Sequence, residues 1–145
     1  MYLRQVEEGL ALLQEALAAA ERTGERCYDA EILRIKGEIL LMQSNRGPSP
    51  AAQSANAVVK AESAALADAG DCFYQSIKIA QRQNAKSLEL RAAMSLARLC
   101  RSQGKQREAW HQLAQIYSSF TEGFQTADLR EAKALLDELS QASLA

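Results

Sequence analysis

The chain has 145 residues, of which 48% are hydrophobic, and it carries 17 basic and 18 acidic side chains. This length suits one domain with a sizeable core, and the apolar content excludes a disordered tail. A net charge of −1 gives the whole chain no electrostatic attraction to nucleic acid or to an anionic membrane. Helix-favouring residues dominate, alanine and leucine above all, so we expect an all-α protein.

The first element expected is a helix over residues 2–22, because its apolar residues recur at spacings of three and four. They form one stripe: Leu3, Val6, Leu10, Leu13, Leu17 and Ala20. Gly24 follows, at a position where helices commonly end in a left-handed residue. A second helix is predicted over 26–42, and its single apolar stripe consists of Ile32, Ile35, Ile39 and Met42.

Both prolines follow in the segment 45–50, where Ser49 is predicted to cap the next helix. The alanine-rich residues 51–68 permit helix but are weakly amphipathic. The helical pattern strengthens over 69–83, and Asn84 ends it.

Three helices are predicted in the last part of the chain. Two of them cover 86–103 and 105–121 and are separated at Gly104. Asp128 is followed three residues later by glutamate, which is the capping-box pattern, and it predicts a last helix over about 129–141.

The cysteines and the N-terminal residues indicate the compartment. The first residues lack a basic segment followed by an apolar run, so no signal peptide is expected, and the apolar stretches are too short to span a membrane. Cys27, Cys72 and Cys100 are odd in number and far apart, which disfavours a disulfide framework or a zinc knuckle. We expect buried free thiols and a cytoplasmic protein.

The sequence repeats itself weakly. At an offset of 60 residues the matched pairs are Ala20 with Ala80, Arg22 with Arg82, and Gly24 with Asn84. Small residues also recur at a spacing of 28, in the pairs Gly9 with Gly37 and Ala69 with Ala97. Small residues at fixed spacing allow two helices to approach closely, as repeated helical hairpins require.

The clearest repeat unit has a small residue in one helix, a larger one three positions later, a turn glycine, and Ala-x-x-x-Leu in the next helix. Its members are Leu96, Ala97, Cys100, Gly104, Ala109, Leu113 and Ile116. These offsets follow the tetratricopeptide pattern. An earlier unit consists of Gly37, Leu40, Ala69, Phe73 and Ser76. A third unit is partial: it contains only the second helix of a hairpin, with Gly9, Leu13 and Ala16.

The two complete units differ in length. Their small residues lie 32 positions apart in the earlier unit (37 to 69) and 12 apart in the later one (97 to 109). Twenty extra residues, about 44–63, are therefore expected as an insertion between the two helices of one hairpin. We predict one tetratricopeptide-like domain over 1–145, a right-handed superhelix of about two and a half hairpins with a C-terminal capping helix.

Residues 85–99 and 117–132 resemble the C-terminal repeat region of large bacterial predicted ATPases, many of which carry a class III adenylate/guanylate cyclase domain at their other end. Residues 9–38 are similar to the preceding repeat of that family. The resemblance implies a superhelix that regulates or localises an attached signalling machine, with this chain as a fragment or stand-alone relative. Cys27 and Cys100 depart from the bulky aromatics of the family, and the ATPase and cyclase portions are absent from this sequence.

Catalytic patterns are missing from the sequence. Gly104-Lys105 is followed by glutamine rather than serine or threonine, so no phosphate-binding loop is present. His111 has no second histidine or cysteine at ligand spacing, and no Gly-x-Ser-x-Gly elbow frames a serine. Trp110 is expected to pack between helices. We expect no enzymatic activity, no cofactor and no metal; a small helical enzyme is the alternative of a different class.

One charge pattern indicates a binding surface. Arg91, Met94, Arg98 and Arg101 share one helical face, and the matching positions of the earlier hairpin are Glu31, Arg34, Glu38 and Met42. In a tetratricopeptide hairpin these positions line the concave groove. The side chains that line it would then change from mixed charge to basic along its length. A protein or peptide partner with carboxylates would fit arginines there. The alternatives are a solvated helix face and a module that binds nucleic acid.

The first helix also predicts self-association. Its stripe of Leu3, Val6, Leu10, Leu13 and Leu17 belongs to a second hairpin helix that lacks a first one. Repeat proteins need polar end faces, and a contiguous apolar strip rarely stays exposed on a soluble monomer. We expect a twofold homodimer in which the first helices cover one another or the partner's insertion; alternatively the insertion folds back within its own chain.

Overall fold

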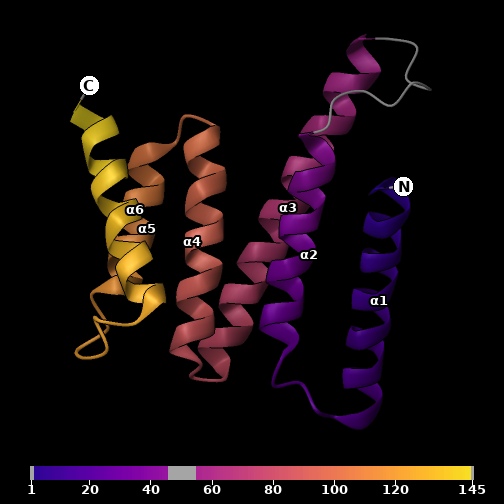
Figure 1. Ribbon diagram of the computed structural model, residues 1–145, viewed down its shortest axis with the longest axis horizontal. Helices are drawn as coiled ribbons and strands as arrows, with labels where there is room; N and C mark the ends of the chain where they lie inside the picture. The colour runs from indigo at the N-terminus through magenta and orange to yellow at the C-terminus, as the bar shows by residue number, and fades with distance from the viewer. Residues whose placement is uncertain (1, 46–54, 145) are drawn as a thin grey trace.

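A computed structural model describes residues 2–45 and 55–144, and these residues form six helices without a strand (Figure 1). The prediction of an all-α protein is confirmed. In chain order the helices are α1 (Tyr2–Thr23), α2 (Asp29–Ser44), α3 (Ala55–Arg82), α4 (Lys86–Ser102), α5 (Gln106–Tyr117) and α6 (Ala127–Leu144). No helix in the described ranges is both long and apolar enough to cross a membrane.

Three helix ends lie where left-handed residues were predicted to stop them. Gly24, Asn84 and Gly104 have φ angles of 76°, 54° and 78°. Gly24 directly follows α1, and Asn84 and Gly104 lie two positions after the ends of α3 and α4. Glycine adopts this conformation without steric cost, and asparagine is among the few other residues that tolerate it. The 60-residue offset between Gly24 and Asn84 therefore relates two equivalent helix ends.

The long helix α3 joins two segments that the sequence pattern had separated. Residues 69–83 carry the stronger apolar pattern, yet the helix runs without a break from Ala55, because alanine favours helix even where little is buried. Part of the predicted insertion 44–63 thus belongs to α3, and its first two residues lie at the end of α2. The remainder, 46–54, which includes Ser49, lies outside the described residues.

The capping box predicted at Asp128 is not formed. Helix α6 begins at Ala127, so Asp128 already lies inside the first turn. Its Oδ2 accepts a hydrogen bond from Arg91 Nε at 2.9 Å instead of capping the helix. A carboxylate in the first turn still interacts favourably with the helix dipole, which explains why the start of this helix was recognised although the cap was not.

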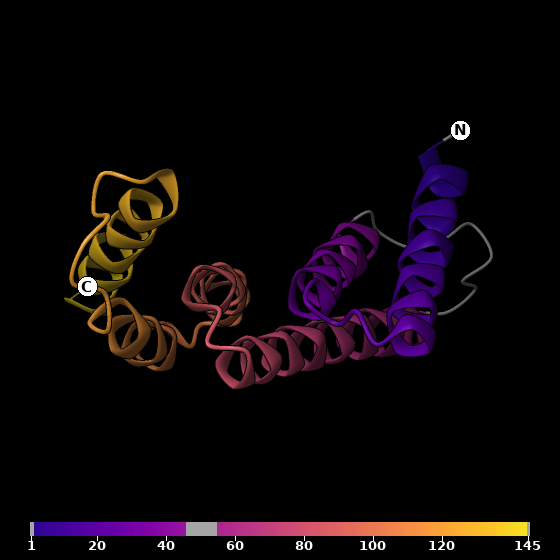
Figure 2. The same ribbon diagram turned by 90° about the horizontal axis from the view of Figure 1, so that it is seen from below.

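The helices alternate in direction, and each packs on the next along the chain (Figure 1). Figure 2 shows that α2, α4 and α6 form one row of an arc, while α3 and α5 form the other. We call α2, α4 and α6 the first row. Its members contact their neighbours within the row. Helices α3 and α5 touch through side chains, since Gln112 Nε2 donates a hydrogen bond to the Tyr74 hydroxyl at 3.2 Å. Among the described helices, α1 packs on α2.

Helix α4 forms the centre of the core. It contacts α2, α3, α5 and α6, and its residues 92–97 are all buried. The larger fully buried side chains around it include Phe73, Leu113 and Leu139. This cluster holds the helices of the first row at fixed distances and so positions the charged residues on their exposed faces.

Small residues mark the close approaches between helices, as the repeat predicted, with one exception. Ala69, Ala97 and Ala109 are buried, and a Cβ atom added at Gly37 would lie 2.5 Å from the Phe73 ring. At Gly9, by contrast, an added Cβ would lie 3.7 Å from Ile39, an ordinary contact distance. The interface between α1 and α2 therefore does not require glycine.

Candidate functional site

The first row carries a network of charged side chains toward the N-terminal ends of its helices, which lie at the bottom of Figure 1 and are called its lower half. Arg34 lies between Glu31 and Glu38 on α2, with Nη2 2.8 Å from Glu31 Oε1 and Nη1 3.5 Å from Glu38 Oε1. Arg91 of α4 lies 3.7 Å from Glu31 and also donates to Asp128 of α6. The network therefore connects all three helices of the row.

Ion pairing within the network changes the titration of Glu31. The hydrogen bond from Arg34 lowers the pKa of the Glu31 carboxyl most strongly; desolvation opposes this, and the positive charges of Arg34 and Arg91 lower the pKa further. The carboxylate form is thus favoured in the folded protein, and the same contacts raise the pKa of Arg34.

A pH-dependent contribution of Glu31 to stability follows. Because its pKa is lower in the folded than in the unfolded chain, its stabilising effect is complete above the ordinary value of 4.5 and is lost as the pH falls through the lower, folded value. The difference in unfolding free energy between wild type and Glu31→Gln should be largest at neutral pH and shrink in acid. Urea unfolding at a series of pH values measures this difference. A difference that does not change with pH would show that Glu31 is not ion-paired in the folded protein.

The upper half of the first row is more open. Arg98 is 45% exposed, and its guanidinium lies 3.7 Å from Glu131 of α6 but makes no hydrogen bond among the described residues. Arg101, one turn further, donates to Glu138. Met42 of α2 is 52% exposed at the matching end of its helix. We call Met42, Arg98 and Arg101 the open half of the row.

Two predictions about the groove need correction. Met94 does not line it, because this side chain is only 3% exposed and belongs to the core around α4. The later part of the groove is also not purely basic. Asp128, Glu131 and Glu138 of α6 lie within ion-pair distance of Arg91, Arg98 and Arg101, respectively, so the face carries both charges.

A signal for these acidic partners was present in the sequence. Arg91 and Asp128 are 37 residues apart, and so are Arg101 and Glu138. Arg98 and Glu131 are 33 residues apart, so the three ion pairs do not share one offset. The offset of 37 between opposite charges marks two of these three contacts between α4 and α6.

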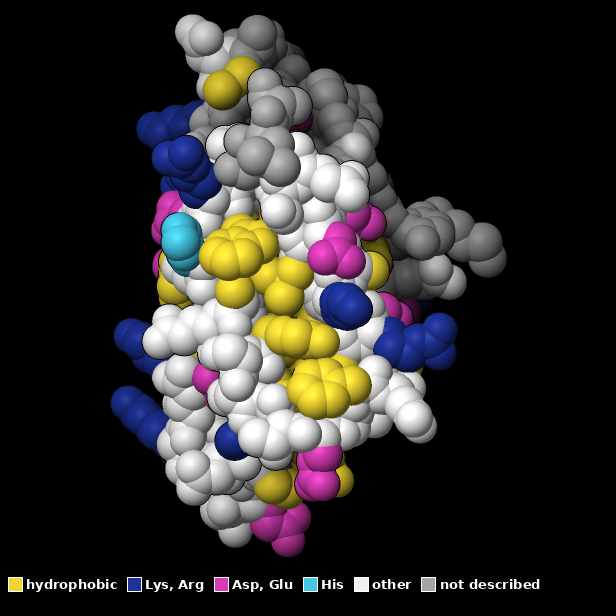
Figure 3. Space-filling view, turned by 90° about the vertical axis from the view of Figure 1, so that its left-hand side faces the viewer, with side chains coloured by type: hydrophobic (Ala, Val, Ile, Leu, Met, Phe, Trp, Pro, Cys, Tyr) yellow, Lys and Arg dark blue, Asp and Glu magenta, His cyan; other side chains and the backbone are white. Residues whose placement is uncertain are grey.

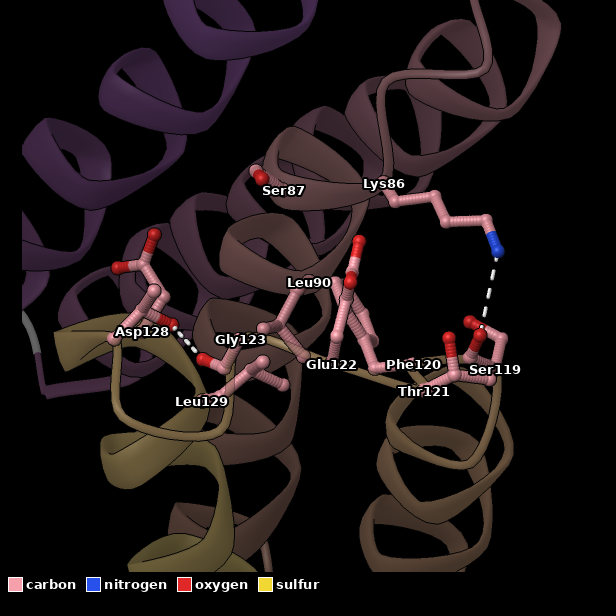
Figure 4. A pocket seen from close by; sticks show the side chains of 11 residues that line it. Lys86, Ser87, Leu90, Ser119, Phe120, Thr121, Glu122, Gly123, Asp128 and Leu129 are labelled. Atoms are coloured by element: carbon pink, nitrogen blue, oxygen red, sulfur yellow. Dashed lines mark hydrogen bonds between the residues drawn. The ribbon is translucent and has the colours of Figure 1, made fainter.

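A pocket of about 400 Å³ lies at the lower edge, between the start of α4 and the segment that joins α5 to α6 (Figure 4). Leu90 and Leu129, both buried, belong to its apolar lining, and Lys86 at its rim donates to the Ser119 carbonyl oxygen at 3.3 Å. Two carboxylates, Glu122 and Asp128, complete the rim. The pocket has room for a side chain of a partner, and its charges are of both signs.

The end of the arc exposes aromatic residues. Figure 3 shows apolar side chains gathered along the face of α5 and α6, beside the histidine. Trp110 is 37% exposed and lies edge-on to His111, with ring centroids 5.3 Å apart, while Phe124 packs near Tyr117. The prediction that Trp110 packs between helices is thus only partly right. No group of three metal-ligating side chains occurs in the described part of the chain.

The cysteines differ from one another in exposure. Cys72 and Cys100 are buried as expected, but Cys27 lies exposed in the turn between α1 and α2, so the prediction was wrong there. Burial raises the pKa of the Cys72 and Cys100 thiols. Since the thiolate is the reactive form, both are expected to react slowly.

Thiol labelling tests this difference. With an aromatic disulfide reagent at pH 8, one thiol per chain should react at once, and the other two only after unfolding in urea. Cys27→Ser should abolish the fast phase. A fast phase that persists in that variant would show that α3 or α4 opens readily.

The predicted self-association stripe is partly covered within the chain. Val6 is buried, and Leu10, Leu13 and Leu17 are half-buried on α1, which packs on α2; the Leu3 side chain lies outside the described residues. Leu12, which was not part of the stripe, is the most exposed large apolar side chain among those that the structure describes in α1. The described part of α3 does not contact α1. The twofold dimer stays a prediction.

Comparisons of the chain with protein-family models, with curated proteins and with solved structures gave no match.

Proposed function

We propose that the chain is a non-enzymatic protein-interaction module with a tetratricopeptide-like arrangement, which binds a peptide along its first row. The partner would place a carboxylate on Arg98 and an apolar side chain on Met42. The observation that carries this proposal is the Arg98 guanidinium, which is about half exposed and has an ion pair at 3.7 Å but no hydrogen bond in the described residues. Arginine binds carboxylates through paired N–H groups, so this side chain retains capacity for a ligand.

The contact pattern supports the repeat part of the proposal. Helices that alternate between two rows, with contacts along the first row, are what stacked helical hairpins produce. The predicted resemblance to the C-terminal repeat region of signalling ATPases fits such a module, which would localise or regulate an attached enzyme. We therefore propose a role in signalling complexes in the cytoplasm.

The other function classes have less support. Arg91, Arg98 and Arg101 each have an acidic partner, which reduces the attraction of this face for phosphates. A function in nucleic-acid binding therefore has less support. An enzyme would need an acid–base pair or a nucleophile with its base, and the residues around the 400 Å³ pocket do not form one in the described structure.

A selection from a random peptide display library tests the proposal. Peptides recovered on the wild-type protein should be enriched in aspartate and glutamate, and their binding should weaken as salt is raised. Arg98→Glu should lower their affinity at least about tenfold, since it replaces an attraction with a repulsion.

The matched control reverses another exposed arginine away from the first row. Arg107→Glu, on α5, makes the same change in net charge and should leave affinity within about twofold. Equal losses in both variants, or no loss in Arg98→Glu, would show that the first row is merely solvated surface. Tighter binding of a single-stranded oligonucleotide than of the selected peptides, measured separately, would favour the nucleic-acid alternative.

A further inference from the structure

The acidic residues of α6 that face the arginines resemble a bound ligand. Glu131 and Glu138 present carboxylates to Arg98 and Arg101, the two cations of the open half. An acidic peptide would have to make the same contacts. The two carboxylates come from the same chain and are therefore always present at high effective concentration.

We infer that α6 acts as a built-in competitor, whose Glu131 and Glu138 occupy the arginines until a partner with at least two neighbouring carboxylates displaces them. This inference rests on the proposed function. It concerns the regulation of the same site: a partner with two neighbouring carboxylates can displace both glutamates, whereas a partner with a single carboxylate displaces one and binds more weakly.

The packing of α6 determines how displacement takes place. Leu129, Ala132, Leu135 and Leu139 are buried against the core, so the helix itself stays in place. Glu131 and Glu138 are 62% and 61% exposed, and they can rotate into solvent without loss of buried contacts. Exposed ion pairs are weak, so a ligand can replace them at low cost.

The positions of the arginines define the class of ligand. Arg98 and Arg101 are three residues apart on one helix, a rise of about 4.5 Å along its axis. Two carboxylates on nearby residues of an acidic peptide span such a distance, whereas a lone carboxylate reaches one arginine only. A short run of glutamates is therefore the simplest probe.

The test measures fluorescence anisotropy of a labelled hexaglutamate peptide, with hexalysine as the control peptide. The variant Glu131→Gln/Glu138→Gln removes the competitor. The matched control, Glu108→Gln/Asp137→Asn, removes two exposed carboxylates of α5 and α6 that have no arginine partner among the described residues. Thermal melts followed by circular dichroism confirm that both variants fold.

We expect the first variant to bind hexaglutamate about threefold to tenfold more tightly than wild type, and the control variant by less than twofold. An equal gain in both variants would show general charge repulsion and overturn the competitor, as would no gain in the first. In either case, wild-type binding that is lost in Arg98→Glu would leave the proposed function standing. Failure of all these proteins to bind hexaglutamate would reject both.

Discussion

Replacement of Phe73 by alanine is expected to lower the free energy of unfolding by about 3–5 kcal/mol. The ring is fully buried in the core cluster and lies against the backbone of α2 at Gly37. Its removal leaves a cavity between α2 and α3 that the backbone of two long helices cannot fill. Urea unfolding followed by circular dichroism measures the change.

The next residue in the chain supplies the control. Tyr74 is 41% exposed, and its hydroxyl accepts only an exposed hydrogen bond from Gln112, so Tyr74→Ala should cost less than about 1 kcal/mol. Similar losses for Phe73→Ala and Tyr74→Ala would mean that α3 does not pack on α2 through this ring, and the order of the rows would then be wrong.

The same substitution at two glycines is expected to have opposite effects. Gly37→Ala places a Cβ 2.5 Å from the Phe73 ring, and overpacking of this kind typically costs about 1–3 kcal/mol. The ring cannot move away easily because it is itself buried. This cost should exceed the gain of about 1 kcal/mol that alanine brings to a helix, so the variant should be less stable than wild type.

Gly9→Ala should instead stabilise the protein by about 0.5–1 kcal/mol, because the new Cβ would lie at an ordinary distance of 3.7 Å from Ile39. Both glycines lie inside helices, so both substitutions gain the same helix propensity. The difference between their effects on stability therefore reports packing alone. If both substitutions stabilise the protein, α2 and α3 are further apart than the structure has them.

Most of the helices were predictable because their signals are local. Apolar spacing and left-handed residues depend only on neighbours in the sequence, which is why Gly24, Asn84 and Gly104 marked helix ends correctly. The continuity of α3 was missed because its first half buries little, so its helix depends on alanine rather than on an apolar stripe. The exposure of Cys27 was missed because cysteine is usually buried, and only the turn between α1 and α2 leaves it outside.

The candidate site was predictable only in part, because its properties depend on neighbouring helices. The helical spacing of Arg91, Arg98 and Arg101 correctly placed them on one face of α4. Their acidic partners come from α6, and a pattern read along one helix does not include the helix beside it. Met94 was misplaced for the same reason: four helices surround α4, so the buried part of its surface is wider than a single stripe.

The most direct test of the binding face is a map of backbone amide chemical shifts, recorded while an acidic peptide from the display selection is added to the labelled protein. If the first row is the binding surface, the largest changes should lie on α2, α4 and α6 around Met42, Arg98 and Glu131. Changes confined to α3 and α5, or to the aromatic end face around Trp110, would contradict it.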